Sequence, residues 1–133
     1  MSVEPAAKPM VEGIFTPAGS DGLAHLLCSR CACGAVAFPA RERCAACSGT
    51  DLVVEEVPNE GTIYSWTTSP GRTVRVVAQV QFANGLMAQG HVTAEPAAVR
   101  IGQRVRTVAV PVDYADDGTP LLSYAFEPVE EAA

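Results

Sequence analysis

All five cysteines of this chain lie close together, and they are the residues best suited to carry chemistry. The five are Cys28, Cys31, Cys33, Cys44 and Cys47. In a zinc ribbon, two pairs of cysteine thiolates sit in tight turns joined by a short strand-like stretch, and both pairs bind one ion with tetrahedral geometry. We therefore predict a structural zinc site that uses four of these five residues as ligands.

The choice of the four ligands has two alternatives at the first pair. Cys44 and Cys47, with two residues between them, form a clear second pair. Cys28 and Cys31 have the same spacing, which favours them as the first pair and leaves Cys33 free. However, Cys33 is followed by Gly34, and a glycine at that place suits the left-handed conformation that often closes a metal-binding turn.

No catalytic constellation accompanies the cysteines in the sequence. His25 and His91 stand far apart in the chain and are typical of ordinary surface or core histidines. No glycine-rich phosphate loop follows a predicted strand, and the pair Asp116 and Asp117 has the character of a turn. We therefore predict that the chain contributes no catalytic residues of its own.

Positive charge is concentrated in the middle of a chain that is acidic as a whole. The net charge is −6, yet residues 61–110 carry five arginines and one glutamate. Arg72, Arg75, Arg104 and Arg106 are candidates to contact the phosphates of an anionic ligand or an acidic partner surface, because guanidinium pairs with phosphate in bidentate geometry. The alternative is that these arginines form only a solvated strand face.

The composition divides the chain into three predicted parts. Residues 1–24 are rich in Pro, Gly and Ala and are predicted to form an N-terminal arm. Residues 25–56 contain the cysteines and are predicted to form the ribbon. Residues 57–133 are dominated by strand patterns and are predicted to form the second folded unit.

Alternating apolar and polar residues predict strands in the third part. Val74, Val76, Ala78, Val80 and Phe82 occupy every second position, which is typical of a strand with one buried face. Asn84 and Gly85 then predict a tight type I′ hairpin turn before the return strand.

Further along the chain, Pro96 and Gly102 bracket a short predicted helix. Other strand patterns lie at residues 61–69, 103–110 and 121–128. Five strands with one helix between the third and fourth predict a mainly β protein that ends in an OB-fold, a five-stranded Greek-key barrel.

The compartment follows from the cysteines and from the hydropathy of the chain. The first residues lack the cationic segment and the apolar run of a secretory signal, and no segment approaches the roughly 20 apolar residues that span a bilayer. Clustered cysteines that bind metal are typical of a reducing compartment. We therefore expect a cytoplasmic protein.

Several motifs resemble one known family. They are Cys33-Gly34, Phe38-Pro39, "ERCAAC", "GTIYSWT", "VQFANGLMAQGHV", "VRIGQRV" and "YAFEP". In this order they resemble the acyl-CoA-associated family in which a rubredoxin-like zinc ribbon precedes an OB-fold, and the likeness runs from Glu12 to Pro128. The resemblance implies a non-catalytic accessory subunit of a thiolase-type enzyme, some of which degrade aromatic compounds or steroids. It also implies a thiolase-like catalytic partner and a coenzyme A thioester as a ligand shared in the heteromer.

The resemblance also bears on the zinc ligands. In the family, a Cys-Gly precedes Phe-Pro at the interval seen here, so Cys33 corresponds to the second ligand, and Cys44 and Cys47 to the third and fourth. The first ligand would then be Cys31 or Cys28, neither of which has the usual family spacing. The residue spacing and the family register therefore leave different cysteines unused.

A rival function is binding of single-stranded nucleic acid, which zinc ribbons and OB-folds also perform. Tyr64 and Trp66 are two residues apart in a predicted strand, so they are expected on one face, where they could stack on bases. The 6% aromatic content and the acidic net charge favour the accessory subunit instead. In that case Val11, Ile14 and Phe15 of the arm are expected either to anchor a partner or to pack between ribbon and barrel.

Overall fold

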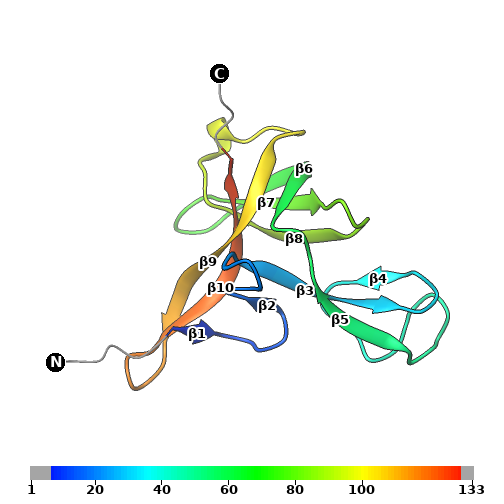
Figure 1. Ribbon diagram of the computed structural model, residues 1–133. Helices are drawn as coiled ribbons and strands as arrows, with labels where there is room; N and C mark the ends of the chain where they lie inside the picture. The colour runs from blue at the N-terminus through cyan, green and yellow to red at the C-terminus, as the bar shows by residue number, and fades with distance from the viewer. Residues whose placement is uncertain (1–6, 130–133) are drawn as a thin grey trace.

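The computed structural model describes residues 7–129, which form two β-sheets and one turn of 3₁₀ helix (Figure 1). The first sheet belongs to the cysteine region and the second to the C-terminal barrel. The elements are β1 (Lys8–Pro9), β2 (Phe15–Thr16), β3 (His25–Cys31), β4 (Val36–Ala37), β5 (Leu52–Glu56), β6 (Glu60–Ser69), β7 (Arg75–Gln81), β8 (Met87–Val92), η1 (Pro96–Ala98), β9 (Arg104–Tyr114) and β10 (Pro120–Pro128). None of the described helical structure is long and apolar enough to cross a membrane.

Strands β6 to β10 close into the predicted five-stranded barrel. β7 pairs antiparallel with both β6 and β8, while β9 pairs antiparallel with both β6 and β10. The barrel closes where β8 and β10 pair in parallel through Val92 and Phe126. This is the strand order of an OB-fold. The expected helix between the third and fourth barrel strands is only the three-residue turn η1.

The barrel core follows the alternation read from the sequence, with one exception. Val76, Ala78 and Val80 are buried, and Phe126 of β10 is fully buried beside them. Val74 was expected on the same buried face but is 59% exposed. It precedes the first residue of β7, so the alternation imposed by strand pairing does not reach it.

The hairpin between β7 and β8 is present, but its turn differs from the predicted type I′. Phe82 and Leu86 close the loop, Gly85 donates to the Phe82 carbonyl at 3.0 Å, and Gly85 has a φ of +88°. Asn84 is not among the described residues with positive φ, and its Oδ1 accepts from the Leu86 N–H at 3.1 Å. The loop is therefore of the three-residue kind with a left-handed glycine, because the Asn84 side chain stabilises the turn without a left-handed backbone.

A β-bulge in β6 overturns the expectation that Tyr64 and Trp66 share a face. The register passes from Ile63 opposite Val80 to Ser65 opposite Gln79, so Tyr64 is the extra residue. Tyr64 is 59% exposed, whereas Trp66 packs against the buried core. An extra residue shifts the alternation by one position, which separates the two aromatic side chains.

The arm is tied to both folded units instead of running free. β1 adds in parallel to β10, at the end of the long β9–β10 hairpin that extends from the barrel (Figure 1). β2 pairs with β3 of the ribbon. At the junction, the Tyr124 ring makes edge contacts with Phe15 of the arm and Phe38 of the ribbon. Phe15 therefore packs between ribbon and barrel, which is one of the two alternatives that the sequence left open for the arm.

Candidate metal centre

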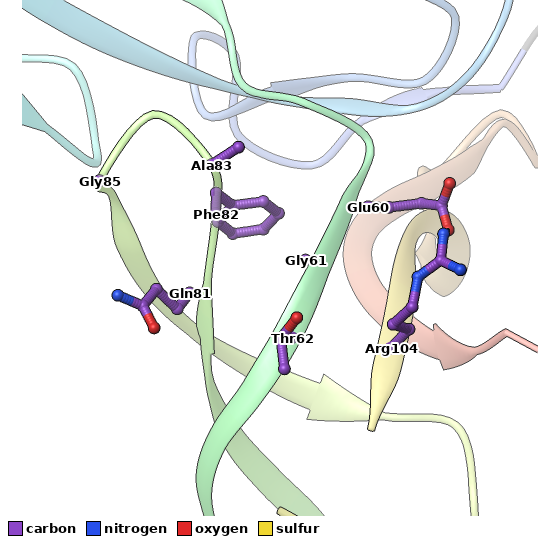
Figure 2. Close-up of a pocket in the computed structure, with 8 residues that line it drawn as sticks. All are labelled: Glu60, Gly61, Thr62, Gln81, Phe82, Ala83, Gly85 and Arg104. Carbon is purple, nitrogen blue, oxygen red and sulfur yellow. The ribbon is translucent and has the colours of Figure 1, made fainter. Parts of the chain in front are cut away.

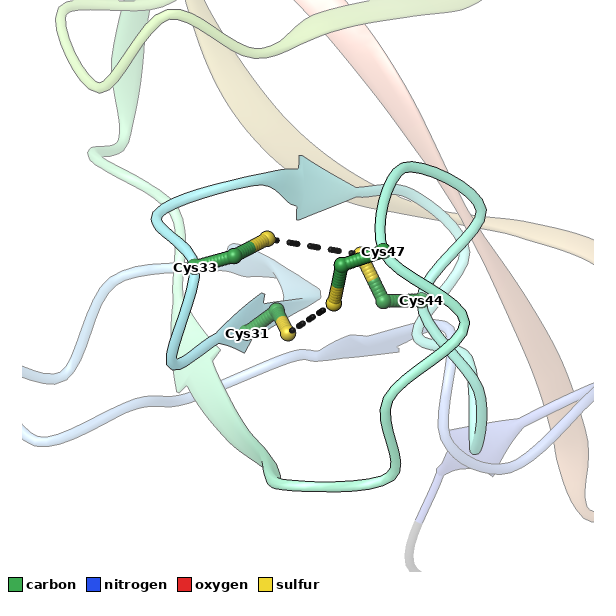
Figure 3. A group of neighbouring side chains, drawn as sticks. All are labelled: Cys31, Cys33, Cys44 and Cys47. Carbon is green, nitrogen blue, oxygen red and sulfur yellow. Dashed lines mark hydrogen bonds between the residues drawn. The ribbon is translucent and has the colours of Figure 1, made fainter.

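Four of the five cysteines gather at one end of the ribbon (Figure 3). Their sulfur atoms all lie within 4.8 Å of one another. The Cys31 and Cys47 sulfurs are 3.5 Å apart, and the Cys33 and Cys44 sulfurs are 3.7 Å apart. Each of these contacts therefore joins a cysteine of the turn at residues 31–34 to a cysteine of the turn at residues 44–49.

The first turn is formed by the end of β3. Cys31 is the last residue of the strand, and its N–H donates to the Ala35 carbonyl at 2.9 Å. The Gly34 N–H donates back to the Cys31 carbonyl at 2.8 Å, and Gly34 has a φ of +97°. Because residues with a Cβ rarely adopt this conformation, glycine is the residue that allows the chain to turn directly after Cys33.

The second turn runs from Cys44 to Gly49 and repeats the same principle. The Cys44 N–H donates to the Gly49 carbonyl at 2.9 Å, and Ser48 takes the left-handed conformation with a φ of +62°. Backbone N–H groups of Ala46 and Gly49 point at the sulfurs of Cys44 and Cys47, at 3.3 and 3.4 Å. Such donors stabilise negative charge on the sulfur atoms.

The geometry of the four sulfurs fits one tetrahedral ion. Sulfur atoms bound to zinc at about 2.3 Å in a tetrahedron lie about 3.8 Å apart. The contacts of 3.5 and 3.7 Å come close to this spacing. A set of four thiolates is also the soft donor set that zinc occupies in structural sites. The four clustered cysteines could therefore hold a zinc ion with little rearrangement.

Backbone donors and neighbouring thiols give Cys31 and Cys44 different pKa values. Backbone N–H groups of Cys47 and Ala46, helped by neighbouring thiols, lower the pKa of Cys44 to about 7. The Cys33 N–H acts to lower the pKa of Cys31, but burial and the adjacent thiols outweigh it and raise that pKa to about 12. Without a cation, Cys44 therefore loses its proton more readily than Cys31. Metal binding at this site would therefore release protons.

Cys28 lies outside the cluster, on the opposite face of β3. It is fully buried in the core between ribbon and barrel, where the Asn84 amide lies 3.9 Å from its sulfur. Burial raises the pKa of the Cys28 thiol. Residues three apart in a strand point to opposite faces, so Cys28 and Cys31 cannot bind one ion, although their spacing suggests a pair. The spacing rule fails because β3 continues through both residues.

A second polar cluster, which the sequence did not suggest, holds the arm on the ribbon. His25 is buried, and its ring nitrogens lie 2.7 Å from the Val57 carbonyl and 2.7 Å from the Asp21 carboxylate. Glu56 lies 3.7 Å from the same nitrogen as Asp21 and accepts from the Ser20 N–H and hydroxyl. Both ring nitrogens thus face acceptors, an arrangement that favours the protonated imidazolium.

The groups of this cluster are spaced as in an ion-pair network. Ligand atoms of separate residues on one ion, each about 2.1 Å from it, lie roughly 3 Å or more apart. The 2.7 Å contact between His25 and Asp21 is a direct hydrogen bond.

The sequence signal that could have found the cluster is the spacing of Asp21 and His25, together with the glycine at position 19. A Cβ at Gly19 would lie 2.5 Å from Glu56 and 2.7 Å from the His25 ring.

The four candidate arginines do not converge on one site. Arg104 lines an open depression of about 480 Å³, where its guanidinium points at the Glu60 carboxylate 2.5 Å away (Figure 2). Arg106 pairs with Glu127 at 3.0 Å. Arg72 and Arg75 make no ion pair within residues 7–129. Glu60 and Glu127 thus partly offset the charge of Arg104 and Arg106, whereas Arg72 and Arg75 have no such partner within residues 7–129.

The barrel is similar to a known family of domains. Residues 54–110 match the family model of the ChsH2 C-terminal OB-fold domain. This part of the chain is similar to the OB-fold domain of ChsH2. No curated protein sequence matches the chain.

A solved structure described as "Ltp2-ChsH2(DUF35) aldolase" is similar to a larger part of the chain. It matches with a TM-score of 0.65 and 24% sequence identity, over 78% of this chain and 84% of that chain. At this identity the match establishes a shared fold. Together, the two matches support the resemblance to the acyl-CoA-associated OB-fold accessory family.

Proposed function

We propose that the chain is a non-catalytic accessory subunit of a thiolase-like acyl-CoA enzyme. The observation that carries the proposal is the match of residues 54–110 to the ChsH2 C-terminal OB-fold domain, in a chain whose fold resembles that of the Ltp2-ChsH2(DUF35) aldolase. The partner would supply the groups that cleave or form the carbon–carbon bond. This chain would shape the acyl-CoA entrance and stabilise the heteromer, in a pathway that degrades aromatic compounds or steroids.

The proposed zinc ion has a structural role. Four cysteine ligands fill a tetrahedral shell and leave no open position for a substrate or a reactive water. The ribbon outside the junction has few large buried side chains, since its buried hydrophobic residues concentrate at β3. The metal would therefore supply the stability that its small core lacks, on the order of 10 kcal/mol in comparable modules.

Arg72 and Arg75 are the arginines best placed to meet anionic groups of coenzyme A or of the partner. Both are exposed and lie in or beside the loop between β6 and β7. Arg104 and Arg106 would first have to leave Glu60 and Glu127, which makes contact with a phosphate less favourable.

The decisive experiment purifies the tagged chain from its native host and identifies what accompanies it. A thiolase-type protein should co-purify in fixed stoichiometry, and the two chains should co-elute after recombinant co-expression. The partner's carbon–carbon cleavage of its acyl-CoA should fall when this chain is withheld, and the chain alone should be inactive. Full activity of the partner without this chain would remove the proposed role.

Single-stranded nucleic acid remains the second candidate, and one observation weakens it. Trp66 packs against the core while Tyr64 projects from a bulge, so the two aromatic residues do not form a stacking platform. We expect weak binding of random single-stranded DNA and RNA at physiological salt, because an acidic chain releases few counterions. Sub-micromolar affinity at about 0.15 M salt would favour this alternative.

A further inference from the structure

A second group of side chains able to bind a metal joins the arm to the ribbon, apart from the cysteine cluster. It consists of Asp21 of the arm, His25 at the start of β3 and Glu56 at the end of β5. Their ligand atoms all lie within 4.8 Å of one another. The side chain of His25 is only 8% exposed, whereas that of Asp21 is 49% exposed. The group therefore combines a buried nitrogen with a ligand that solvent reaches.

The contacts of His25 direct one of its ring nitrogens at two carboxylates. Nδ1 lies 2.7 Å from the Val57 carbonyl, which can only accept, so Nδ1 carries a proton. Nε2 lies 2.7 Å from the Asp21 carboxylate and 3.7 Å from the Glu56 carboxylate. A bare lone pair on Nε2 would face two negative groups that also only accept. The arrangement therefore favours a cation between these atoms, which is either a proton on Nε2 or a metal ion.

Each of the three ligand groups is oriented by a hydrogen bond with the backbone. The Val57 carbonyl accepts from the imidazole at 2.7 Å. The Ser20 N–H donates to the Glu56 carboxylate at 3.2 Å. The Leu23 N–H donates to the Asp21 carboxylate at 3.0 Å. Metal-binding side chains are typically held by such a second set of hydrogen bonds, which fixes the histidine tautomer and the direction of each carboxylate.

The donor set indicates which metal suits the group. Two carboxylates beside a neutral imidazole leave two negative charges, which one divalent cation balances. Mg²⁺ and Ca²⁺ take oxygen ligands, whereas imidazole nitrogen and carboxylate oxygen are both ligands of Zn²⁺. Atoms bound to zinc at about 2.1 Å lie roughly 3 Å or more apart, so Asp21 must move a few tenths of an ångström away from His25. Its exposed side chain allows this movement.

We propose that Asp21, His25 and Glu56 form a second zinc site, in which the ion replaces the proton on Nε2. Three protein ligands leave one position of a tetrahedral ion to water. The ion fastens the arm to β3 and β5 of the ribbon. It is held more weakly than an ion bound by four thiolates, so it dissociates on desalting. The inference goes beyond the proposed function, because it requires neither coenzyme A nor a partner subunit.

The test adds Zn²⁺ to the untagged, zinc-loaded full chain after desalting, near neutral pH. Isothermal titration calorimetry counts the added ions, and NMR follows the imidazole nitrogens. One further zinc should bind per chain. The Nε2 resonance of His25 should shift to that of a metal-bound nitrogen, while Nδ1 keeps its proton on the Val57 carbonyl. Mg²⁺ at the same concentration should leave both ring nitrogens unchanged, because it favours oxygen ligands.

Two pairs of variants link the second ion to these side chains. Asp21→Asn changes a half-exposed ligand, so the chain stays folded, and it should weaken the second zinc at least tenfold. Asp116→Asn changes an exposed carboxylate outside the group and should have no effect. His25→Gln should abolish binding of the second zinc. His91→Gln changes the exposed histidine and is its control.

A second zinc that is weakened by Asp21→Asn and shifts Nε2 of His25 supports the site. The site is wrong if no second zinc binds, if the Nε2 resonance does not move, or if Asp21→Asn and Asp116→Asn bind zinc alike. Loss of the second zinc in His91→Gln would assign the ion to that exposed histidine instead. The His25 resonances report this site alone, so the result depends neither on the zinc content of the cysteines nor on a thiolase-like partner.

Discussion

At the scale of single residues, the direction of each cysteine side chain decides its role. Cys31 and Cys28 are both buried on the same strand, but only Cys31 faces the other thiols. Cys28 instead belongs to the core between ribbon and barrel. A zinc ligand and a core residue respond differently to the same substitution, which allows a direct test.

Cys44→Ser should release zinc and unfold the ribbon, because it removes one of four ligands. Cys28→Ser should keep one equivalent of zinc and cost about 1 to 3 kcal/mol, because it places a hydroxyl in an apolar site. Metal analysis after desalting, combined with thermal unfolding, measures both effects. Loss of zinc in Cys28→Ser, with zinc retained in Cys31→Ser, would reverse the assignment.

His25 should make stability depend on pH. Burial acts to lower the pKa of His25, but hydrogen bonds to Val57 and Asp21 and the nearby carboxylates raise it above its usual value of 6.5. A raised folded pKa means that the stabilisation is complete below about pH 6.5 and is lost as the pH rises through the folded pKa. His25→Gln should flatten this decline.

The measurement is the free energy of unfolding of the zinc-loaded protein between pH 5.5 and about pH 9, followed by chemical denaturation. His91→Gln is the matched control, since His91 is exposed and is the other of the two histidines. Equal pH profiles for the parent and His25→Gln would show that the cluster carries no linked proton.

At the scale of elements, the meeting of β8 with β10 requires a residue without a side chain. A Cβ at Gly90 would lie 2.7 Å from the Tyr124 ring and 2.8 Å from the Phe126 ring. Both rings belong to the aromatic cluster at the junction and have little room to move. Gly90 therefore allows β8 to approach β10 at the one place where the barrel closes.

Gly90→Ala should destabilise the chain by about 1 to 3 kcal/mol, because overpacking forces the rings from their positions. Gly71→Ala is the control, since its Cβ would meet only one atom, at the ordinary contact distance of 3.6 Å. Denaturant midpoints of both variants give the comparison. A Gly90→Ala protein as stable as the parent would mean that the Tyr124 and Phe126 rings can move to accommodate the added Cβ.

At the scale of the whole molecule, the arm binds ribbon and barrel into one structure. Phe15 is only 3% exposed and contacts Tyr124, whereas Val11 is 59% exposed. Ile14 is partly buried against the same core. Of the three arm residues considered as partner anchors, only Val11 keeps most of its surface free. Removing the arm would therefore damage the fold as well as any contact with a partner.

Phe15→Ala should lower the free energy of unfolding by about 3 to 5 kcal/mol, because it leaves a cavity between arm, ribbon and barrel. Val11→Ala should leave stability within about 0.5 kcal/mol of the parent. If the exposed arm surface meets a thiolase-like partner, Val11→Ala should weaken the heteromer in gel filtration while the isolated chain stays folded. A stable Phe15→Ala protein would contradict the proposed role of the junction.

The sequence by itself determined the features that depend on local pattern. Alternation placed Val76, Ala78 and Val80 in the barrel core, because a strand sends every second side chain to one face. The Asn84 and Gly85 pair located the hairpin, and Gly34 marked the turn after Cys33, since Gly85 and Gly34 take positive φ angles that few other residues tolerate. The order of strands then indicated the OB-fold.

Only the tertiary structure decided the features that depend on where a strand ends or slips. Cys28 and Cys31 have the spacing of a metal-binding pair, but β3 continues through both and turns them to opposite faces. The bulge at Tyr64 places its side chain away from that of Trp66. Arg104 and Arg106 form ion pairs with carboxylates of distant segments. Strand length, register and long-range ion pairs arise from contacts between segments far apart in the chain. The spacing of residues along the sequence therefore does not predict them.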